Sequence, residues 1–174
     1  MRKTMANKPD DALEEVSQTT ELSPELIQFK TLLESTFIDV ELAFVMTDQI
    51  PSVVVPKESL HDLCVFLKTN SVYDSKMLSC MAGVDYVDYC QILYILYSVE
   101  NNCTIGIKCN VEYDCKIQTV SDIWKAADWY EREIHDLYGI EFEGHEDMSP
   151  LLLYDGFEGH PGKRDFPFYN YEEY

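Results

Sequence analysis

Apolar residues recur along this chain with two different periods, which predict helices in some segments and strands in others. Helical spacing, with apolar residues three or four apart, begins at Ser23-Pro24, at Pro56 and at Ser121. The third of these segments runs to about Tyr138 and ends where Gly139 suits a left-handed C-cap. The apolar positions of the three predicted helices are Leu26, Phe29, Leu32 and Leu33, then Leu60, Leu63, Cys64 and Leu67, then Ala127, Tyr130, Ile134 and Leu137.

Extended segments occupy most of the chain between these helices. They are short β-branched or alternating apolar runs at residues 41–47, 52–55, 77–84, 89–99 and 104–113. Asn101-Asn102 joins the last two runs, and because Asn tolerates positive φ the pair predicts a tight hairpin. The pattern predicts an α+β fold: a small, largely antiparallel sheet with helices packed on it, followed by an extended irregular C-terminal tail.

Three regions follow from this pattern. Residues 1–22 are polar and lack a period, which predicts a mobile N-terminal arm, and residues 23–139 form the predicted α+β domain. Residues 140–174 form a predicted docking tail that is rich in Gly and Pro. From residue 128 to the end, 13 acidic and three basic residues are interspersed with many apolar ones. A disordered acidic tail would not carry so much apolar surface, so this segment either folds back over the sheet or lies as a strap on another protein.

The charge of the chain excludes two classes of partner. Thirteen Lys and Arg against 32 Asp and Glu give a net charge of −19. A free-standing nucleic-acid-binding protein needs cationic groups to displace counterions from phosphates, and an anionic membrane surface would likewise repel this chain. No apolar run reaches the roughly 18 residues that a spanning helix needs. We therefore expect no nucleic acid and no direct membrane span.

Neither the cysteines nor the glycines form a cofactor motif. The six cysteines, at positions 64, 80, 90, 103, 109 and 115, include no CxxC pair, and a strand would spread the last three over roughly 40 Å. No secretory signal precedes them, so we expect free thiols in a reducing compartment and no metal or iron–sulfur cluster. The glycines of residues 156–164 do not form a phosphate-binding loop, because five residues separate Gly156 from Gly162 and Arg follows Lys163. We expect no catalytic, cofactor-binding or metal-binding residue.

Charged residues crowd the third predicted helix and leave two interpretations open. Glu131, Glu133 and His135 are the candidate groups for a stand-alone acid–base enzyme. Glu131 and Glu133 are two residues apart, however, and therefore splay to different sides of a helix. In the other interpretation the polar side of this helix faces solvent. Ion pairs between side chains four residues apart, such as Arg132 and Asp136, would stabilise it.

The same helix carries the first of two motifs of a known family. The signature of the thirty-kilodalton (C-type) subunit of respiratory complex I closely resembles residues 129–145, which read WYEREIHDLYGIEFEGH. The second motif of that family, normally HPLRKDFP, resembles residues 156–167, which read GFEGHPGKRDFP. With weaker likeness upstream, the resemblance covers about residues 50–170.

This chain departs from the family pattern at two places. Gly162 stands where the second motif has Leu, and Lys163-Arg164 inverts its Arg-Lys, which keeps the charge but not the fork geometry. After His145 two arginines that are usual in the family are missing. The resemblance therefore carries no arginine contact over to that position.

The resemblance implies a cofactor-free accessory subunit in the peripheral arm of a proton-pumping NADH:quinone oxidoreductase, with FMN and iron–sulfur clusters in other subunits. It implies that the chain braces the large quinone-site subunit and the adjacent iron–sulfur subunit. The location would be the matrix side of the mitochondrial inner membrane or the cytoplasmic face of a bacterial membrane. Equivalent subunits of ferredoxin-linked complexes or membrane-bound hydrogenases are the alternative.

Under this interpretation a set of charged residues anchors the tail or a neighbouring subunit through charge-assisted hydrogen bonds. The expected partner-docking residues are Glu131, Arg132, Glu133, Asp136, His145, His160, Lys163, Arg164 and Asp165.

Overall fold

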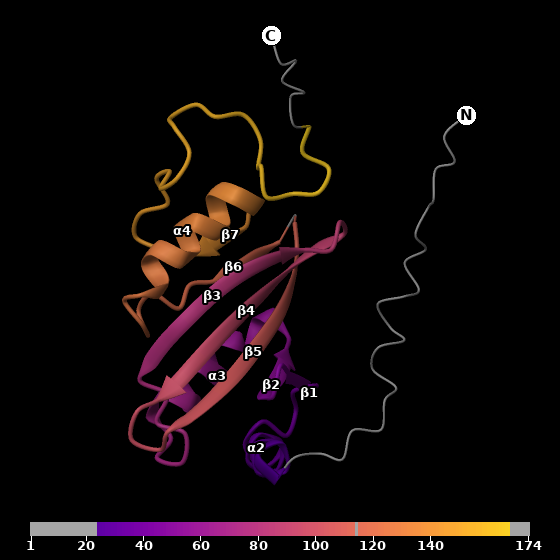
Figure 1. Cartoon of the computed structure of the whole chain (residues 1–174), viewed down its shortest axis with the longest axis vertical. Helices are drawn as coiled ribbons and strands as arrows, with labels where there is room; N and C mark the ends of the chain where they lie inside the picture. The colour runs from indigo at the N-terminus through magenta and orange to yellow at the C-terminus, as the bar shows by residue number, and fades with distance from the viewer. Residues whose placement is uncertain (1–23, 114, 168–174) are drawn as a thin grey trace, which may run out of the picture.

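The structure, a computed structural model, describes residues 24–113 and 115–167 (Figure 1). The predicted N-terminal arm at residues 1–22, the predicted helix cap Ser23, and residues 168–174 of the predicted tail lie outside the described residues.

A five-stranded sheet forms the centre of the molecule (Figure 1). Its strands are β1 (Ala43–Thr47), β2 (Ile50–Val55), β3 (Met77–Asp85), β4 (Tyr89–Ser98) and β5 (Cys103–Glu112). They lie in the order β1-β2-β5-β4-β3, with β2 and β5 parallel and every other neighbouring pair antiparallel. Asn102 takes a φ of 48° in the turn that joins β4 to β5, so the predicted hairpin is confirmed. The predicted α+β class with a largely antiparallel sheet is also confirmed.

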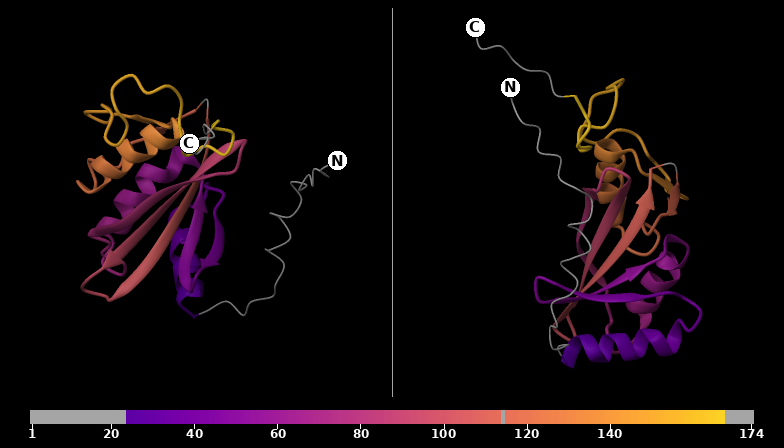
Figure 2. Two further views of the ribbon diagram at one scale, coloured as in Figure 1. Left: turned by 45° about the horizontal axis from the view of Figure 1, so that its top comes forward. Right: turned by 90° about the vertical axis from the view of Figure 1, so that its right-hand side faces the viewer.

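Three helices pack on this sheet. Helix α2 (Pro24–Thr36) contacts β1 and β2, α3 (Lys57–Thr69) contacts β5 from behind the sheet in the view of Figure 1, and α4 (Ala127–Tyr138) contacts the edge strand β3. Figure 2 shows α2 and α4 near opposite ends of the sheet. The predicted apolar stripe of α3 is confirmed, since all four of its members are fully buried: Leu60, Leu63, Cys64 and Leu67.

Helix α4 begins five residues later than the predicted cap at Ser121 implies. Ser121 does not cap a helix; its hydroxyl instead lies 2.8 Å from that of Thr119, and residues 121–126 form turns. Within these turns the indole of Trp124 is buried and donates a hydrogen bond to the carbonyl oxygen of Ser75 at 3.0 Å. This tertiary contact favours the turns over a longer helix. The left-handed C-cap is confirmed at Gly139, which has a φ of 78°.

The described part of the predicted irregular tail, residues 140–167, contains one strand. β7 (Glu141–Glu143) pairs in parallel with β6 (Lys116–Gln118), and α4 lies between them in sequence. Ile140 and Phe142 are buried in the core, together with Ile117 of the partner strand. The sequence prediction missed both β6 and β7 because three residues are too few to show a period. The irregular segment that remains, residues 144–167, is called the strap below.

All six cysteines are unpaired. Over residues 24–113 and 115–167, none of the helices has both the length and the apolar character that crossing a bilayer requires.

Candidate functional site: the seam between helix α4 and the strap

The strap crosses the outer side of α4 and turns back toward the tip of the β3–β4 hairpin (Figure 1). It has no regular secondary structure, so its backbone groups need partners from elsewhere in the protein. Those partners come mainly from α4, and the line of contact between α4 and the strap is called the seam below.

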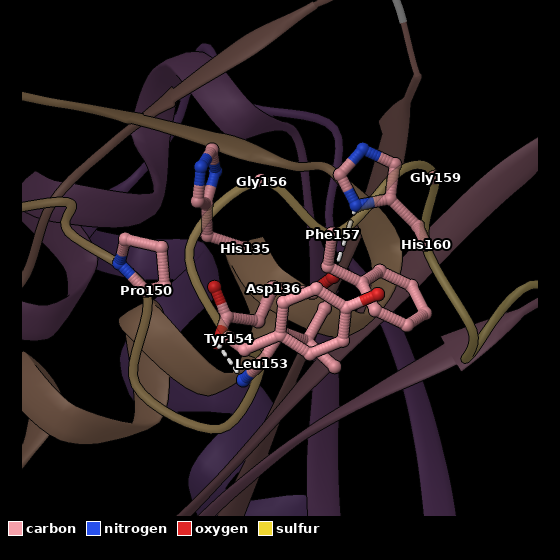
Figure 3. A pocket seen from close by; sticks show the side chains of 9 residues that line it. All are labelled: His135, Asp136, Pro150, Leu153, Tyr154, Gly156, Phe157, Gly159 and His160. Atoms are coloured by element: carbon pink, nitrogen blue, oxygen red, sulfur yellow. Dashed lines mark hydrogen bonds between the residues drawn. The ribbon is translucent and has the colours of Figure 1, made fainter.

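Asp136 holds the strap at two points. One oxygen of its carboxylate, Oδ2, accepts hydrogen bonds from the backbone N–H groups of Leu151, Leu152 and Leu153 at 2.8, 2.8 and 3.2 Å. Its backbone carbonyl accepts a further hydrogen bond from Nδ1 of His160 at 2.9 Å (Figure 3). Burial alone would raise the pKa of Asp136, but the three N–H groups outweigh burial and hold this pKa below its usual range. The charged carboxylate is therefore the form that fixes the strap.

Arg132, one helical turn before Asp136, fixes the preceding part of the strap. Its Nε donates to the carbonyl oxygen of Ser149 at 3.0 Å, and its Nη2 donates to the hydroxyl of Ser149 at 3.0 Å and the carbonyl of Pro150 at 3.2 Å. A rigid guanidinium with several donors suits such a cluster of acceptors. Arg132 and Asp136 thus do not pair with each other, as the sequence had suggested; both bind the strap.

Two glycines allow the second motif to approach α4 closely. A Cβ atom at Gly139 would lie 2.5 Å from Nε2 of His160, and one at Gly162 would lie 2.8 Å from the carbonyl oxygen of Leu137. That same carbonyl accepts a hydrogen bond from the N–H of Gly162 at 2.8 Å. The departure from the family pattern at position 162 therefore coincides with a direct backbone contact in this structure.

The far end of the strap is fixed on the hairpin by Asp85, which the sequence analysis did not select. Its carboxylate accepts hydrogen bonds from the backbone N–H of Arg164 at 2.7 Å and the hydroxyl of Tyr113 at 2.6 Å. Nζ of Lys163 lies 3.9 Å from the centroid of the Tyr113 ring, within cation–π range. Burial opposes ionisation of Asp85, yet its hydrogen bonds keep its pKa below the usual range. Asp165 is exposed beside them.

Glu131 lies on the inner side of α4 and is fully buried. It accepts hydrogen bonds from the hydroxyl of Thr119 and from the N–H of Val120. Burial raises its pKa to about 7, although these two hydrogen bonds oppose the rise. Nε2 of His145, from the start of the strap, lies 3.8 Å from the Glu131 carboxylate and 3.0 Å from that of Asp128. The interpretation of this helix as having a solvated polar face is therefore wrong for Glu131 and Asp136, which are both buried.

The candidate acid–base groups do not converge on one cavity. Glu131 is sealed inside the core, and Glu133 lines an open groove beside Trp129. His135 lines a separate small cavity of about 150 Å³ under the strap, together with His160 (Figure 3). Nδ1 of each of these histidines is hydrogen-bonded to a backbone carbonyl oxygen. Across the described part of the chain, no three His, Cys, Asp or Glu side chains are grouped as metal ligands would be.

The nine predicted docking residues thus fall into four groups. Arg132, Asp136 and His160 make the seam, and Lys163 and Arg164 fix the far end of the strap. Glu131 and His145 lie buried on the inner side of α4, while Glu133 and Asp165 make no hydrogen bond or ion pair among those found within residues 24–113 and 115–167. Docking to a partner stays a prediction for all nine.

Sequence reasoning missed Asp85, Tyr113 and Thr119 as members of the site. Asp85 had one signal, since it lies in the GVDY segment that contributes to the weaker upstream family likeness. Nothing in the sequence marks Tyr113 or Thr119, which enter only through tertiary contacts.

Comparison with known proteins links these features to one family. The sequence profile described as "Respiratory-chain NADH dehydrogenase, 30 Kd subunit" matches residues 53–172, which include the whole described strap. The second C-type subunit of the NADH-quinone oxidoreductase of Rhizobium meliloti is 38% identical over 122 residues, which are 68% of this chain and 67% of that protein. The C-type subunit of the Geobacter sulfurreducens NADH-quinone oxidoreductase is 36% identical over 121 residues, 67% of this chain and 74% of that protein.

A mitochondrial relative and a solved structure extend the similarity. NADH dehydrogenase [ubiquinone] iron-sulfur protein 3 of Candida albicans is 34% identical over 132 residues, 74% of this chain and 47% of that protein. A chain in the structure of the membrane-bound sulfane sulfur reductase, an archaeal respiratory membrane complex, shares the fold with a TM-score of 0.65. That match has 24% sequence identity and covers 82% of this chain and 86% of the other.

Proposed function

Because this chain belongs to the 30 kDa subunit family of respiratory-chain NADH dehydrogenase, we propose that it is a structural subunit of the peripheral arm of an NADH:quinone oxidoreductase. Members of the family are subunits, so the chain works within a multi-subunit respiratory complex. It supplies no catalytic group and binds no cofactor, and electron transfer from NADH to quinone takes place only in the assembled complex. The bacterial relatives are named as subunits of NADH-quinone oxidoreductases. These names do not favour the two alternatives, a subunit of a hydrogenase-type complex and a stand-alone enzyme.

The geometry of the seam is the observation that carries this proposal. Arg132 and Asp136, two charged residues of the first motif, bind backbone groups of the strap rather than line a common cavity. Fixing an irregular segment with several charge-assisted hydrogen bonds gives an outer surface of defined shape. Such a surface suits the bracing of neighbouring subunits and has no arrangement of groups for chemistry.

The partners that fit this role are the large quinone-site subunit and the iron–sulfur subunit beside it. In our proposal the strap and the outer side of α4 lie against them, and FMN and the iron–sulfur clusters belong to other subunits. The position would be on the matrix side of the mitochondrial inner membrane, or on the cytoplasmic face in a bacterium. Surface residues such as Glu133 and Asp165 would contact the partner directly, whereas buried Glu131 and His145 would act by holding α4 and the strap together.

Purification of the tagged chain from its native host tests this function. The proposal predicts near-stoichiometric recovery of other subunits of an NADH:quinone oxidoreductase, together with NADH-driven quinone reduction by the recovered complex. The isolated chain should reduce no quinone and show no visible absorption band. A chain that is recovered alone, or that turns over a substrate by itself, would overturn the proposal.

A further inference from the structure

An open groove lies beside the seam, between helix α4 and the first part of the strap. Its volume is about 480 Å³, and its lining consists of Trp129, Tyr130 and Glu133 from α4 and Leu151 and Leu152 from the strap. The side chains of the lining are thus mostly apolar, with one carboxylate and one tyrosine hydroxyl. The groove is separate from the cavity of Figure 3, which lies under the strap near His135.

The two walls of the groove expose large apolar side chains. Trp129 is 66% exposed and Leu152 is 59% exposed. Trp124, the other tryptophan of the chain, is in contrast buried and hydrogen-bonded. Adjacent exposed tryptophan and leucine side chains are uncommon on a free surface, and tryptophan is enriched among residues that contribute most to protein interfaces.

The groove is held in shape before anything binds to it. Asp136 fixes the backbone of Leu151 and Leu152 through hydrogen bonds of 2.8 Å, and the hydroxyl of Tyr130 donates to the carbonyl oxygen of Ser79 at 3.4 Å. Because its walls are already ordered, binding there loses little conformational entropy. The hydrogen bonds of the seam therefore fix not only the strap but also the strap side of the groove.

Charge decides what can occupy this groove. No ion pair of Glu133 is present within residues 24–113 and 115–167, and the strap carries five acidic against two basic residues. A second copy of the chain, with its own net charge of −19, would bring like charge to this surface. Residues 168–174 contain two glutamates and no base, so they are equally unsuited. Residues 1–23 hold three basic against five acidic residues, so they too are net acidic. The complementary occupant is therefore a cationic apolar segment of another protein.

We propose that the groove docks a segment of a neighbouring subunit in which an apolar side chain stands next to a Lys or Arg. The apolar side chain lies between Trp129 and Leu152, and the cation pairs with Glu133. The inference rests on the proposed function and adds to it the place and the chemistry of one contact.

Photo-crosslinking within the complex tests the place of contact. Position 129 receives p-benzoylphenylalanine in the tagged chain, and position 38, where Ile38 is 81% exposed far from the groove, receives it as the matched control. After illumination of the purified complex, peptides joined to position 129 are identified by mass spectrometry. The proposal predicts crosslinks from position 129 to a peptide of another subunit that has an apolar residue beside Lys or Arg. Crosslinks to residues 1–23, to residues 168–174, to a second copy or to a partner peptide without a base would overturn it.

Charge variants test the chemistry of contact. Glu133→Lys should lower the amount of chain retained in the complex at least about tenfold, because like charges would then meet, and Glu133→Gln should lower it less. The control Glu41→Lys makes the same change at an exposed position before β1 and should leave retention unchanged. Circular dichroism checks that each variant is folded. If a folded Glu133→Lys is retained like the wild type, or if the complex assembles but position 129 gives no crosslink, the inference fails while the proposed function stands. If no complex co-purifies with the wild-type chain, both fail.

Discussion

Asp85 and Arg164, 79 residues apart in the sequence, are joined by a hydrogen bond of 2.7 Å from the backbone N–H of Arg164 to the carboxylate of Asp85. The contact ties the last described part of the strap to the end of β3. With the contacts of Arg132 and Asp136, it fixes the strap at its middle and its far end, so the strap behaves as part of the domain surface rather than as a free tail.

Replacing Asp85 by Asn should loosen the far end of the strap. The N–H that Asp85 binds belongs to the peptide bond between Lys163 and Arg164, which trypsin cleaves. Losing a hydrogen bond to a charged acceptor weakens such a contact by about 1.5–3 kcal/mol, so cleavage at this bond should be at least about tenfold faster. Asp88→Asn, an exposed change in the same turn, is the control and should leave the rate unchanged. Equal cleavage rates in Asp85→Asn and wild type would show that the contact does not hold the strap.

Replacing Asp136 by Asn should weaken the middle of the strap. The amide oxygen still accepts hydrogen bonds but has lost its charge, so we expect the free energy of unfolding to fall by about 1–2 kcal/mol in urea titration. Amide hydrogen exchange should speed up at Leu151, Leu152 and Leu153 in particular. Asp62→Asn, on the exposed side of α3, should change neither measurement. Unchanged exchange at the three leucines would contradict the geometry of the seam.

Gly139 and His160 should be coupled energetically. Gly139→Ala forces a Cβ into a left-handed residue and against the His160 ring, and we expect it to destabilise the fold by about 2 kcal/mol. His160→Ala removes the ring and its hydrogen bond to Asp136, so the double variant should be less destabilised than the sum of the two single ones. Thermal unfolding of the four proteins measures this difference. Strictly additive effects would mean that the ring does not pack on the glycine.

Glu131 should give the protein a pH-dependent stability. Its ordinary pKa is 4.5, and burial raises the pKa in the folded state to about 7. Between pH values equal to these two pKa values, the folded state binds more protons than the unfolded state. Protonated Glu131 therefore stabilises the fold. This stabilisation is complete below the pKa of the unfolded state and is lost as the pH rises through the pKa of the folded state. Asp122 and Asp128 add to the rise, and His145 lies 3.8 Å away.

The variant Glu131→Gln removes this titration. Relative to the variant, the wild-type free energy of unfolding should fall by an amount on the order of 3 kcal/mol between about pH 4.5 and pH 8. Urea titrations of both proteins across this range measure the fall. Parallel curves for the two proteins would contradict the raised pKa.

The sequence predicted the sheet well because its strands are long enough to show their period. In β5 the alternating residues Ile105, Ile107, Cys109 and Val111 are all buried, as expected from their spacing. The errors, the start of α4 and the missed strands β6 and β7, arise where tertiary contacts decide the local structure. Trp124 is held by Ser75, and Phe142 by its pairing opposite Ile117, and neither partner is near in sequence.

The sequence selected two residues that the structure shows in contact with the strap, but it did not show which charged residues of α4 are buried. Arg132 and Asp136 were selected from the first motif and do bind the strap. Their spacing of four residues suggested a surface pair, because spacing alone cannot show that a distant segment will cross the helix and supply better partners. For the same reason the sequence could not predict that Asp85 accepts a hydrogen bond from the backbone of Arg164.

The claim that the seam serves assembly rather than chemistry is tested most directly by Arg132→Ala in the native host. Lys125→Ala, an exposed change just before α4, is the control. The amount of assembled complex and the NADH:quinone turnover per assembled complex are measured for both variants and the wild type. The account predicts several-fold less complex in Arg132→Ala, with unchanged turnover in each complex that forms. Normal assembly with collapsed turnover would contradict it.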